Sequence, residues 1–364
     1  YGAMSGRSDD FSIGGRMTNR VYLDWNATAP LRVEAHAAMI AAMETVGNPS
    51  SVHAEGRAAK SIVERARAQV AQAFGAVSAD IVFTASATEA AALALSGRGL
   101  QSALVEHDCV SIWTESVLQC DRAGDVAVID PQNSTLQHAN SETGVIQTLP
   151  QGLAVSDFVQ SFGKIPVGFD WSGAEMGLLS AHKIGGPKGV GALVLRQGVD
   201  LAPYIRGGGQ EMGRRAGTEN VIGIAGFGAA AEAAAKDLSD GVWERVESLR
   251  DLLEERLVNE VPETIIMGYA SKRLPNTSAF AVRGWKGETQ VMQMDLAGFA
   301  ISAGSACSSG KVKPSKVLLA MGCDDLTAAS AIRVSIGPTT TETDILRFGD
   351  AWIKEYQRFA ARAA

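Results

Sequence analysis

The chain has 364 residues, of which 46% are hydrophobic and 20% are charged, a composition typical of a folded protein with two domains. Its 33 Lys and Arg against 40 Asp and Glu give a net charge of −7, which argues against nucleic acid as a partner. No apolar run reaches the roughly 20 residues that cross a bilayer, so no membrane partner is expected and a cytoplasmic location is predicted.

The first 16 residues, YGAMSGRSDDFSIGGR, are polar, rich in Gly and Ser, and precede Met17. We interpret residues 1–16 as a tag or linker, with a native disordered extension as the alternative, and leave them out of the fold prediction. The cysteines have neither CxxC nor zinc-ligand spacing, so free thiols in a reducing compartment and no metal site are expected. They are Cys109, Cys120, Cys307 and Cys323.

In chain order, short apolar runs alternate with helical patterns. The segment VYLDWNATAP (21–30) reads as a strand and turn, and residues 57–74 form an amphipathic helical pattern that ends at Gly75. Strands that alternate with helices predict an α/β domain with a mostly parallel sheet, whose ligands bind beyond the carboxyl ends of the strands. The further predicted strands lie at 81–84, 103–106, 126–130, 154–159, 177–180 and 190–195.

The second half of the chain changes character. Residues 221–261 are Ala-rich and helical, and Gly241 is expected to divide them into two helices. A strand at 277–282 and a helix at 344–361 then give an α+β pattern. We therefore expect a large domain and a small domain, made respectively of residues 31–240 and of residues 17–30 plus 241–364.

A lysine with unusual neighbours occupies the segment SAHKIGGPKGVGAL (180–193). Lys183 follows a short apolar strand, lies next to Ser180 and His182, and precedes Gly-rich backbone. A lysine amine in such a place can form a Schiff base with an aldehyde cofactor, while the Ser and His hold an anion beside it. A surface lysine on a Gly-rich turn is the alternative.

The segment FTASATEAAALAL (83–95) predicts a helix that begins directly after a strand. Free N–H groups and the helix dipole make such a start, here Ser86 to Glu89, well suited to a phosphate. Plain N-capping by Ser86 or Thr88 is the alternative.

Two titratable residues stand at predicted strand ends. Asp157 could pair with a protonated ring nitrogen and make that ring a better electron sink, or it could cap the strand end. His107 could stack on a planar ligand and move protons near neutral pH, or it could be a structural histidine.

Cys307 lies in the segment ISAGSACSSGKVKPSKVL (301–318), whose small polar residues permit exposure and movement. Lys311 and Lys313 would favour its thiolate form; a loop cysteine without a role is the alternative. Taken together, the lysine, the helix start, the carboxylate, the imidazole and the thiol describe pyridoxal phosphate chemistry with a thiol nucleophile.

Four segments resemble the cysteine desulfurases of the NifS/IscS type, which are class V aminotransferase-like, fold-type I pyridoxal phosphate enzymes. The resemblance runs from about Val21 to the C-terminal helix, and the loop from Cys307 to Pro314 has the length of the group I enzymes. It implies a seven-stranded, mostly parallel sheet in the large domain and a smaller α+β domain. The segments are SAHKIGGPKGVGAL, GGGQEMGRRAGTENVIGIAGFGAA (207–230), SAGSACSS (302–309) and GNPSSVHAEGRAA (47–59).

The resemblance also implies a role for each candidate residue. Lys183 would hold pyridoxal phosphate and shuttle the substrate α-proton, Asp157 would pair with the pyridine nitrogen, and His107 would stack on the ring and act in proton transfer. The other implied roles are phosphate binding by the Ala87 backbone, Thr88, Ser180, His182 and, from the neighbouring subunit, Thr218; hydrogen bonds to the ring hydroxyl from Asn140 and Gln160; and binding of the substrate carboxylate by Asn26 and Arg333.

The implied reaction converts L-cysteine to L-alanine. The Cys307 thiolate would attack the substrate sulfur and become a persulfide, whose sulfur passes to an acceptor protein such as an iron–sulfur scaffold. The role of Thr218 implies a homodimer. Two alternatives stay open: another pyridoxal phosphate enzyme of the same fold, such as a selenocysteine lyase, a C–S lyase or an aminotransferase, and a non-catalytic relative that serves as a binding partner.

Several departures from the family pattern lie near the cofactor. Ser86 replaces the usual glycine, Ser141 stands in the usual Asn-Asn-Glu, residues 155–157 read Val-Ser-Asp in place of His-Val-Asp, and Trp25 precedes Asn26. The stretch between Gly124 and Asn140 is also shorter than usual by roughly one strand–helix unit. The lysine, aspartate, cysteine and arginine chemistry is intact, so these departures predict a divergent member of the family.

Overall fold

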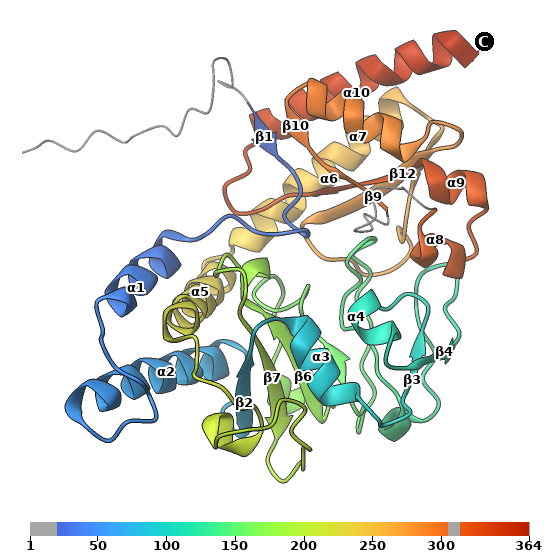
Figure 1. Ribbon diagram of the computed structural model, residues 1–364. Helices are drawn as coiled ribbons and strands as arrows, with labels where there is room; N and C mark the ends of the chain where they lie inside the picture. The colour runs from blue at the N-terminus through green and yellow to red at the C-terminus, as the bar shows by residue number, and fades with distance from the viewer. Residues whose placement is uncertain (1–19, 305–313, 364) are drawn as a thin grey trace, which may run out of the picture.

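The computed structural model describes residues 20–304 and 314–363 (Figure 1). In this part of the chain, no helix is long and apolar enough to cross a membrane. The described cysteines, Cys109, Cys120 and Cys323, are free thiols. Predictions that fall outside the described residues concern the segment 1–16 and Cys307 with its neighbours Lys311 and Lys313.

The large sheet is built from two ladders that single bridges join. One ladder has the order β2–β7–β6–β5 and the other pairs β3 with β4; an extended segment, 134–138, bridges both. β7 runs antiparallel to its two neighbours, whereas the remaining pairs are parallel, so the predicted mostly parallel α/β sheet is confirmed. The strands are β2 (Ala79–Thr84), β3 (Gln101–Ala103), β4 (Glu115–Leu118), β5 (Ser156–Asp157), β6 (Met176–Ser180) and β7 (Gly191–Arg196).

Two strand predictions are wrong in detail. The strand expected at 103–106 ends at Ala103, where the N–H of Glu106 donates to the Ala103 carbonyl and turns the chain. The strand expected at 126–130 is reduced to a bridge between Val126 and Cys120, and Ile129 is 92% exposed. Apolar composition predicted both, but sheet partners decide which backbone becomes a strand.

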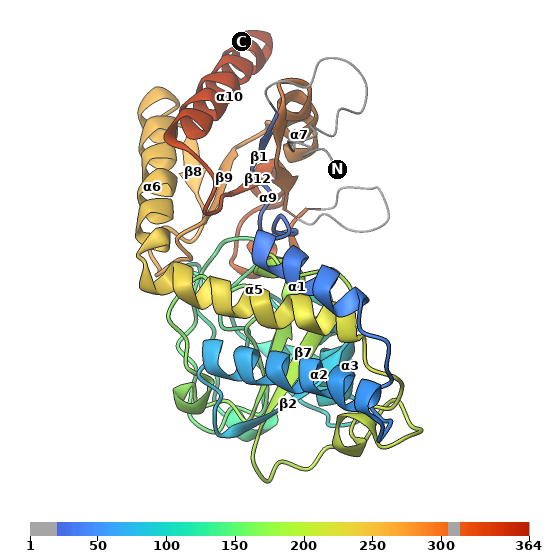
Figure 2. The same ribbon diagram turned by 90° about the vertical axis from the view of Figure 1, so that its left-hand side faces the viewer.

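Helices cover both faces of this sheet. α2 (Ala54–Ala73) and α5 (Val221–Ser239) lie on one face, and α1 (Val33–Met43) packs against α5 (Figure 2). α2 confirms the helix predicted at 57–74, and it ends before Gly75, whose φ is +59°. α3 (Ala87–Leu95) and α4 (Asp108–Ser111) lie on the other face.

The stretch between Gly124 and Asn140 contains an extended segment that pairs like a strand and no α-helix. The segment 134–138 pairs on both sides through backbone hydrogen bonds, from Thr135 to Gln101 (2.8 Å) and from His138 to Asp157 (2.9 Å). Before it stands only a 3₁₀ turn, Pro131–Asn133. Parallel neighbours normally need a helical crossover, and this one is reached without an α-helix; the shortening by roughly one strand–helix unit stays a prediction.

The rest of the chain forms an antiparallel sheet of order β11–β12–β9–β8 with helices packed around it. β1 pairs in parallel with β10, which ties the N-terminal segment to this part. Gly241, with φ +72°, separates α5 from the following helix as predicted. The elements are β1 (Val21–Tyr22), α6 (Val242–Glu260), β8 (Thr264–Ile266), β9 (Thr277–Val282), α7 (Gly287–Leu296), β10 (Phe299–Ala300), β11 (Ser302–Ala303), α8 (Lys316–Ala320), α9 (Asp325–Ser330), β12 (Ala331–Ser335) and α10 (Glu342–Ala363).

Separate hydrophobic clusters form beneath the two sheets. One gathers Phe74, Phe158 and Phe227 under the large sheet. Another gathers Trp285 and Trp352, whose ring centroids lie 5.2 Å apart, around the antiparallel sheet. The boundary near residue 240 remains a proposal.

Candidate active site

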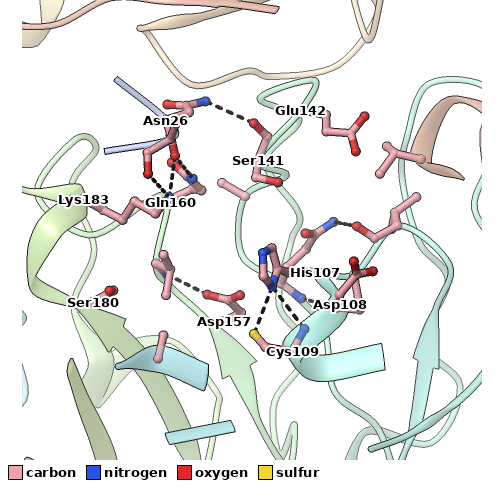
Figure 3. Close-up of a pocket in the computed structure, with 18 of the residues that line it drawn as sticks. Asn26, His107, Asp108, Cys109, Ser141, Glu142, Asp157, Gln160, Ser180 and Lys183 are labelled. Atoms are coloured by element: carbon pink, nitrogen blue, oxygen red, sulfur yellow. Dashed lines mark hydrogen bonds between the residues drawn. The ribbon is translucent and has the colours of Figure 1, made fainter. Parts of the chain in front are cut away.

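A cavity of about 490 Å³ lies where the carboxyl ends of β5 and β6 face the antiparallel sheet (Figure 3). Parallel sheets bind ligands beyond the carboxyl ends of their strands, so the cavity lies where the sequence predicts a binding site. The predicted site residues that line it are Asn26, Ala87, Thr88, His107, Asp157, Gln160, Ser180, His182, Lys183 and Arg333.

Lys183 projects into this cavity from a 3₁₀ turn, Ala181–Lys183, that follows β6 directly. Its Nζ donates hydrogen bonds to the backbone oxygens of Asn26 (2.6 Å) and Ala27 (2.8 Å). Burial, and then the charge of Arg333, lower the Lys183 pKa to about 8. About a tenth of this amine is therefore uncharged and nucleophilic at pH 7, far more than for an ordinary lysine.

The first turn of α3 offers an anion site at one end of the cavity. Ser86 caps the helix, since its Oγ accepts the N–H of Glu89 (3.2 Å). Ala87 and Thr88, the first two residues of the helix, line the cavity, and their N–H groups have no intrahelical acceptor. A Cβ on Gly191 would lie 2.5 Å from the Ser86 carbonyl carbon, so only glycine fits beside this turn. Ser86, which stands where the family usually has glycine, therefore acts as the N-cap of α3.

Two further polar groups, Ser180 and His182, stand beside Lys183. Ser180 ends β6 and lines the cavity. His182 Nδ1 lies 3.1 Å from Thr28 Oγ1. Burial, and then the charge of Lys183, lower the His182 pKa to about 4, so this imidazole is neutral and can still donate one hydrogen bond to an anion.

Asp157 and His107 meet at the floor of the cavity (Figure 3). The Asp157 Oδ1 accepts the N–H of Val159 (2.8 Å), and burial raises the Asp157 pKa against the opposing effect of His107 and Lys183. A cationic ring nitrogen would offset that burial. This arrangement suits the predicted pairing of Asp157 with a protonated pyridine.

His107 caps α4 with its own ring. Its Nδ1 accepts the backbone N–H of Cys109 (3.1 Å), and the Cys109 Sγ lies 3.0 Å from the same nitrogen. Because Nδ1 acts as an acceptor, the neutral ring carries its proton on Nε2. Burial raises the Cys109 pKa, so this thiol stays protonated.

Glu106 is a cavity residue that sequence reasoning missed. Its Oε1 accepts the N–H of Gln137 (2.6 Å), while Oε2 is buried without a hydrogen-bond partner among the described residues. Burial, and then the charge of Asp157, raise its pKa to about 8. Its position directly before His107 was the available signal.

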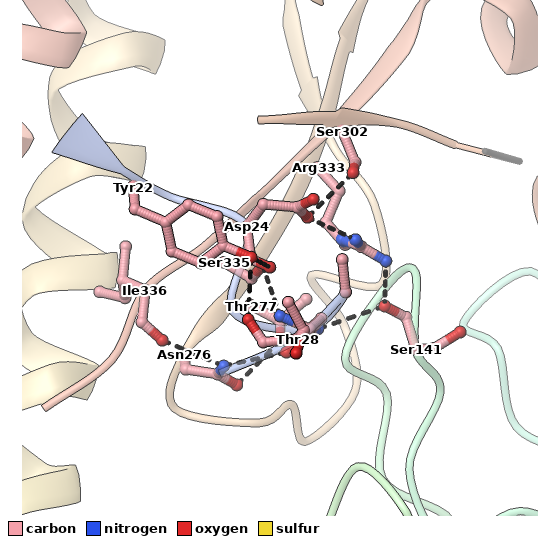
Figure 4. A network of polar contacts seen from close by, with 12 residues as sticks. Tyr22, Asp24, Thr28, Ser141, Asn276, Thr277, Ser302, Arg333, Ser335 and Ile336 are labelled. Atoms are coloured by element: carbon pink, nitrogen blue, oxygen red, sulfur yellow. Dashed lines mark hydrogen bonds and ion pairs between the residues drawn. The ribbon is translucent and has the colours of Figure 1, made fainter. Parts of the chain in front are cut away.

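Arg333 lines the cavity from β12, and Figure 4 shows its polar partners. Its Nη2 pairs with Asp24 Oδ1 (2.7 Å), and its Nη1 donates to the Ser141 carbonyl (3.0 Å). Ser302 Oγ also donates to Asp24 Oδ1 (2.9 Å). The Arg333 Nε is buried and has no partner among the described residues. The guanidinium is thus held in place and keeps donor capacity for a carboxylate.

Asn26 reaches the cavity through its backbone. Its side-chain Nδ2 donates to Thr277 Oγ1 (2.8 Å) and to the Ser141 carbonyl (3.2 Å). Its Oδ1 accepts from Lys164 Nζ and Asn276 Nδ2, each at 3.0 Å. A substrate carboxylate would have to displace one of these bonds, so the predicted contact with Asn26 stays a prediction.

Two predicted cofactor residues do not line the cavity. Asn140 is buried in its turn, where Oδ1 accepts the N–H groups of Glu142 and Thr143, each at 2.9 Å. Its neighbour Ser141 lines the cavity instead. Thr218 is exposed and lies against a separate hollow beside Gly189. Both roles therefore stay predictions.

The donors around the cavity fit pyridoxal phosphate. A free helix start and neutral His182 suit a dianionic phosphate, buried Asp157 suits a cationic pyridine nitrogen, and Lys183 suits the aldehyde. Within the described residues, no group of three acidic, His or Cys side chains suits a metal ion.

Comparison with known proteins defines the class first. The model of the family "Aminotransferase class-V" matches residues 21–116 and 117–348, and the chain belongs to this family. Its enzymes use pyridoxal phosphate, the cofactor expected from the sequence. The chain is 37% identical over 365 positions to "Cysteine desulfurase IscS" of Dictyoglomus turgidum, with 90% of this chain and 92% of the relative covered. It is 39% identical over 366 positions to a cysteine desulfurase of Cereibacter sphaeroides, with 90% and 93% covered.

Solved structures agree with this placement. A NifS-like protein from Rickettsia africae superposes with a TM-score of 0.84 at 30% identity, covering 93% of this chain and all of that one. The predicted resemblance to NifS/IscS cysteine desulfurases and the fold-type I architecture are confirmed. In the Dictyoglomus comparison, 90% of this chain is about 328 residues, so about 37 of the 365 positions have no residue here.

Proposed function

We propose that this chain is a pyridoxal-phosphate-dependent cysteine desulfurase that converts L-cysteine to L-alanine and leaves the sulfur on Cys307. The observation that carries the proposal is the buried amine of Lys183, whose pKa is lowered to about 8, in one cavity with Asp157 and Arg333. Gly304 and Pro314, which border the segment that contains Cys307, also line that cavity.

Each residue contributes a distinct step. When bound, pyridoxal phosphate supplies an electron sink that makes the substrate α-proton acidic. Lys183 binds the aldehyde and, once released by the substrate amine, accepts that proton at Nζ and returns it to the product. His107 Nε2–H is a second proton donor at the cavity floor. Arg333 orients the substrate through its carboxylate.

The sulfur step needs no outside oxidant. The Cys307 thiolate attacks the substrate sulfur, the carbon–sulfur bond breaks, and the electron pair of that bond stays with the product carbon, which takes up a proton to give alanine. The enzyme gains one sulfur atom as Cys307–S–SH. A second thiol, on an acceptor protein, then removes the outer sulfur by attack on the persulfide. An iron–sulfur scaffold is the acceptor class we propose.

We also propose that the enzyme is a homodimer. Thr218 is exposed and does not line the cavity of its own chain, so a phosphate contact from Thr218 requires a second copy. Apolar side chains on and after α1 are exposed, with Val33 at 78% and Val46 at 81%, a pattern typical of an interface. Light scattering should give twice the chain mass, and Thr218→Ala should weaken pyridoxal phosphate retention.

A cytoplasmic location is proposed from the free thiols of the described residues.

The visible absorption spectrum of the purified protein tests the proposal. Protein supplied with pyridoxal phosphate should absorb in the visible range, and L-cysteine should change that spectrum and release alanine. Lys183→Ala should abolish the covalent absorption band. Rapid turnover of an amino acid without sulfur, with cysteine inert, would instead indicate another enzyme of the same fold.

A further inference from the structure

A second lysine is buried beside the catalytic one. Lys164 follows β5 in a tight turn and is 3% exposed. Its Nζ donates to Gln160 Oε1 (2.7 Å) and to Asn26 Oδ1 (3.0 Å). Neither acceptor is a carboxylate, and within the described residues Lys164 has no ion-pair partner. Burying a four-carbon amine without a counter-charge is costly, so its hydrogen bonds point to a role at this site.

The Lys164 amine helps to fix which way the side-chain amides of Gln160 and Asn26 are turned. An amide nitrogen and oxygen are similar in shape, and the Lys164 Nζ, which donates to both amides, meets the oxygen of each. Gln160 accordingly turns Oε1 toward Lys164 and Nε2 away from it. Independently, the Gln160 Nε2 donates to the Asn26 carbonyl (3.0 Å), an oxygen that can only accept. Both constraints select the same orientation.

The same carbonyl links this network to the catalytic amine. The Asn26 backbone oxygen accepts from Gln160 Nε2 (3.0 Å) and from Lys183 Nζ (2.6 Å) (Figure 3). Gln160 and Lys183 both line the cavity, whereas Lys164 does not. The hydrogen bonds of Lys164 therefore reach the cavity through Gln160 and Asn26, and its charge acts on Lys183 and His182 as well.

The protonation of Lys164 is consistent with this arrangement. Burial, and then the charges of Lys183 and Arg333, lower its pKa well below the ordinary value. A neutral amine still has two hydrogens, which suffice for its two acceptors. The groups whose charges act on Lys183 are Arg333, Asp157, Asp24 and Cys109, and Lys183 in turn acts on Lys164 and His182.

We propose that Lys164 is a positioning residue that fixes the Gln160 amide so that its N–H group, and not its oxygen, is presented to the cofactor in the cavity. The inference rests on pyridoxal phosphate binding at this site and not on the sulfur chemistry. The second hydrogen of Gln160 Nε2 is then free to donate to the ring oxygen of the cofactor. Such a donor stabilises the ionised form of that oxygen and lowers the basicity of the neighbouring lysine nitrogen.

The test is a pH titration of the visible absorption of the bound cofactor, without substrate. Lys164→Met keeps the length of the side chain and removes its donors. It should move the titration midpoint upward by about half a unit or more and weaken cofactor retention about tenfold, since it leaves Gln160 Oε1 unpaired. Lys354→Met, at an exposed position of α10, is the matched control and should change neither quantity.

A double-mutant cycle identifies the route of the effect. Gln160→Leu alone should raise the midpoint, and Lys164→Met added to it should raise it no further. If Lys164→Met does not fold, Lys164→Gln replaces it and should shift the midpoint in the same direction by less.

An unchanged midpoint in every foldable Lys164 variant, with only a lower melting temperature, would overturn the inference and leave Lys164 with a packing role. Additive shifts in the cycle would overturn the route through Gln160. A wild-type protein that binds no cofactor would instead contradict the site assignment itself.

Discussion

The acidity of the Lys183 ammonium group gives the most quantitative prediction. Its pKa is lowered from 10.5 to about 8, with burial as the largest cause and Arg333 as the second. At pH 7 about 9% of such an amine is neutral, against about 0.03% at the ordinary pKa. Stripped protein should therefore capture pyridoxal phosphate about 300-fold faster at pH 7 than an ordinary lysine would allow.

The assay follows the rise of visible absorption after pyridoxal phosphate is mixed with stripped protein between pH 6 and 10. The free amino acid derivative N-acetyl-lysine, treated identically, corrects for ionisation of the reagent. The rate should rise with pH and level off above about 8, because the neutral amine is the nucleophile. Arg333→Gln removes the second cause and leaves Asp24, whose charge raises the pKa, so the midpoint should move upward. A midpoint near 10.5 in the wild type, or a downward shift in Arg333→Gln, would refute the reasoning.

Three further predictions follow from other sites. Glu106→Gln should raise the melting temperature increasingly between pH 4.5 and 8, because the unfolded chain releases this proton from about 4.5 and the folded chain only near 8; an equal difference at pH 4 and 8 would contradict it. Arg273→Met should cost about 3–5 kcal/mol in urea unfolding by leaving Glu254 buried without its partner, and Arg273→Met with Glu254→Leu should recover much of it; a double variant as unstable as the single one would argue otherwise. Gly191→Ala should weaken pyridoxal phosphate binding about tenfold or more, because its Cβ meets Ser86 at 2.5 Å; unchanged binding in equilibrium dialysis would show that the turn yields freely.

The sequence predicted the position of site residues best where a motif lies at the end of a strand. Lys183 follows β6, Asp157 ends β5, and Ala87 begins α3 directly after a strand, so the parallel arrangement alone brings all three to one edge. The helix predicted at 57–74 was readable because its buried face repeats every three to four residues.

The sequence could not predict which polar side chains are engaged by their neighbours and which line the cavity. Asn140 and Ser141 are adjacent in the chain, yet the first is consumed by its own turn and the second lines the cavity. Asn26 likewise has its amide engaged by neighbours far away in sequence, such as Thr277. Lys164 lies in an unremarkable turn, and only its two acceptors reveal its link to the site. Each outcome depends on partners that tertiary packing brings together.

The persulfide on Cys307 is the central claim, and mass spectrometry of the intact protein after one turnover tests it most directly. L-cysteine labelled with ³⁴S should add one labelled sulfur atom to the wild type, located on the peptide that contains Cys307, with one alanine released. Cys307→Ala should keep the cofactor and its visible absorption but gain no sulfur and form alanine at least a hundredfold more slowly. Full alanine production by Cys307→Ala, or labelled sulfur on Cys109 instead, would contradict the account.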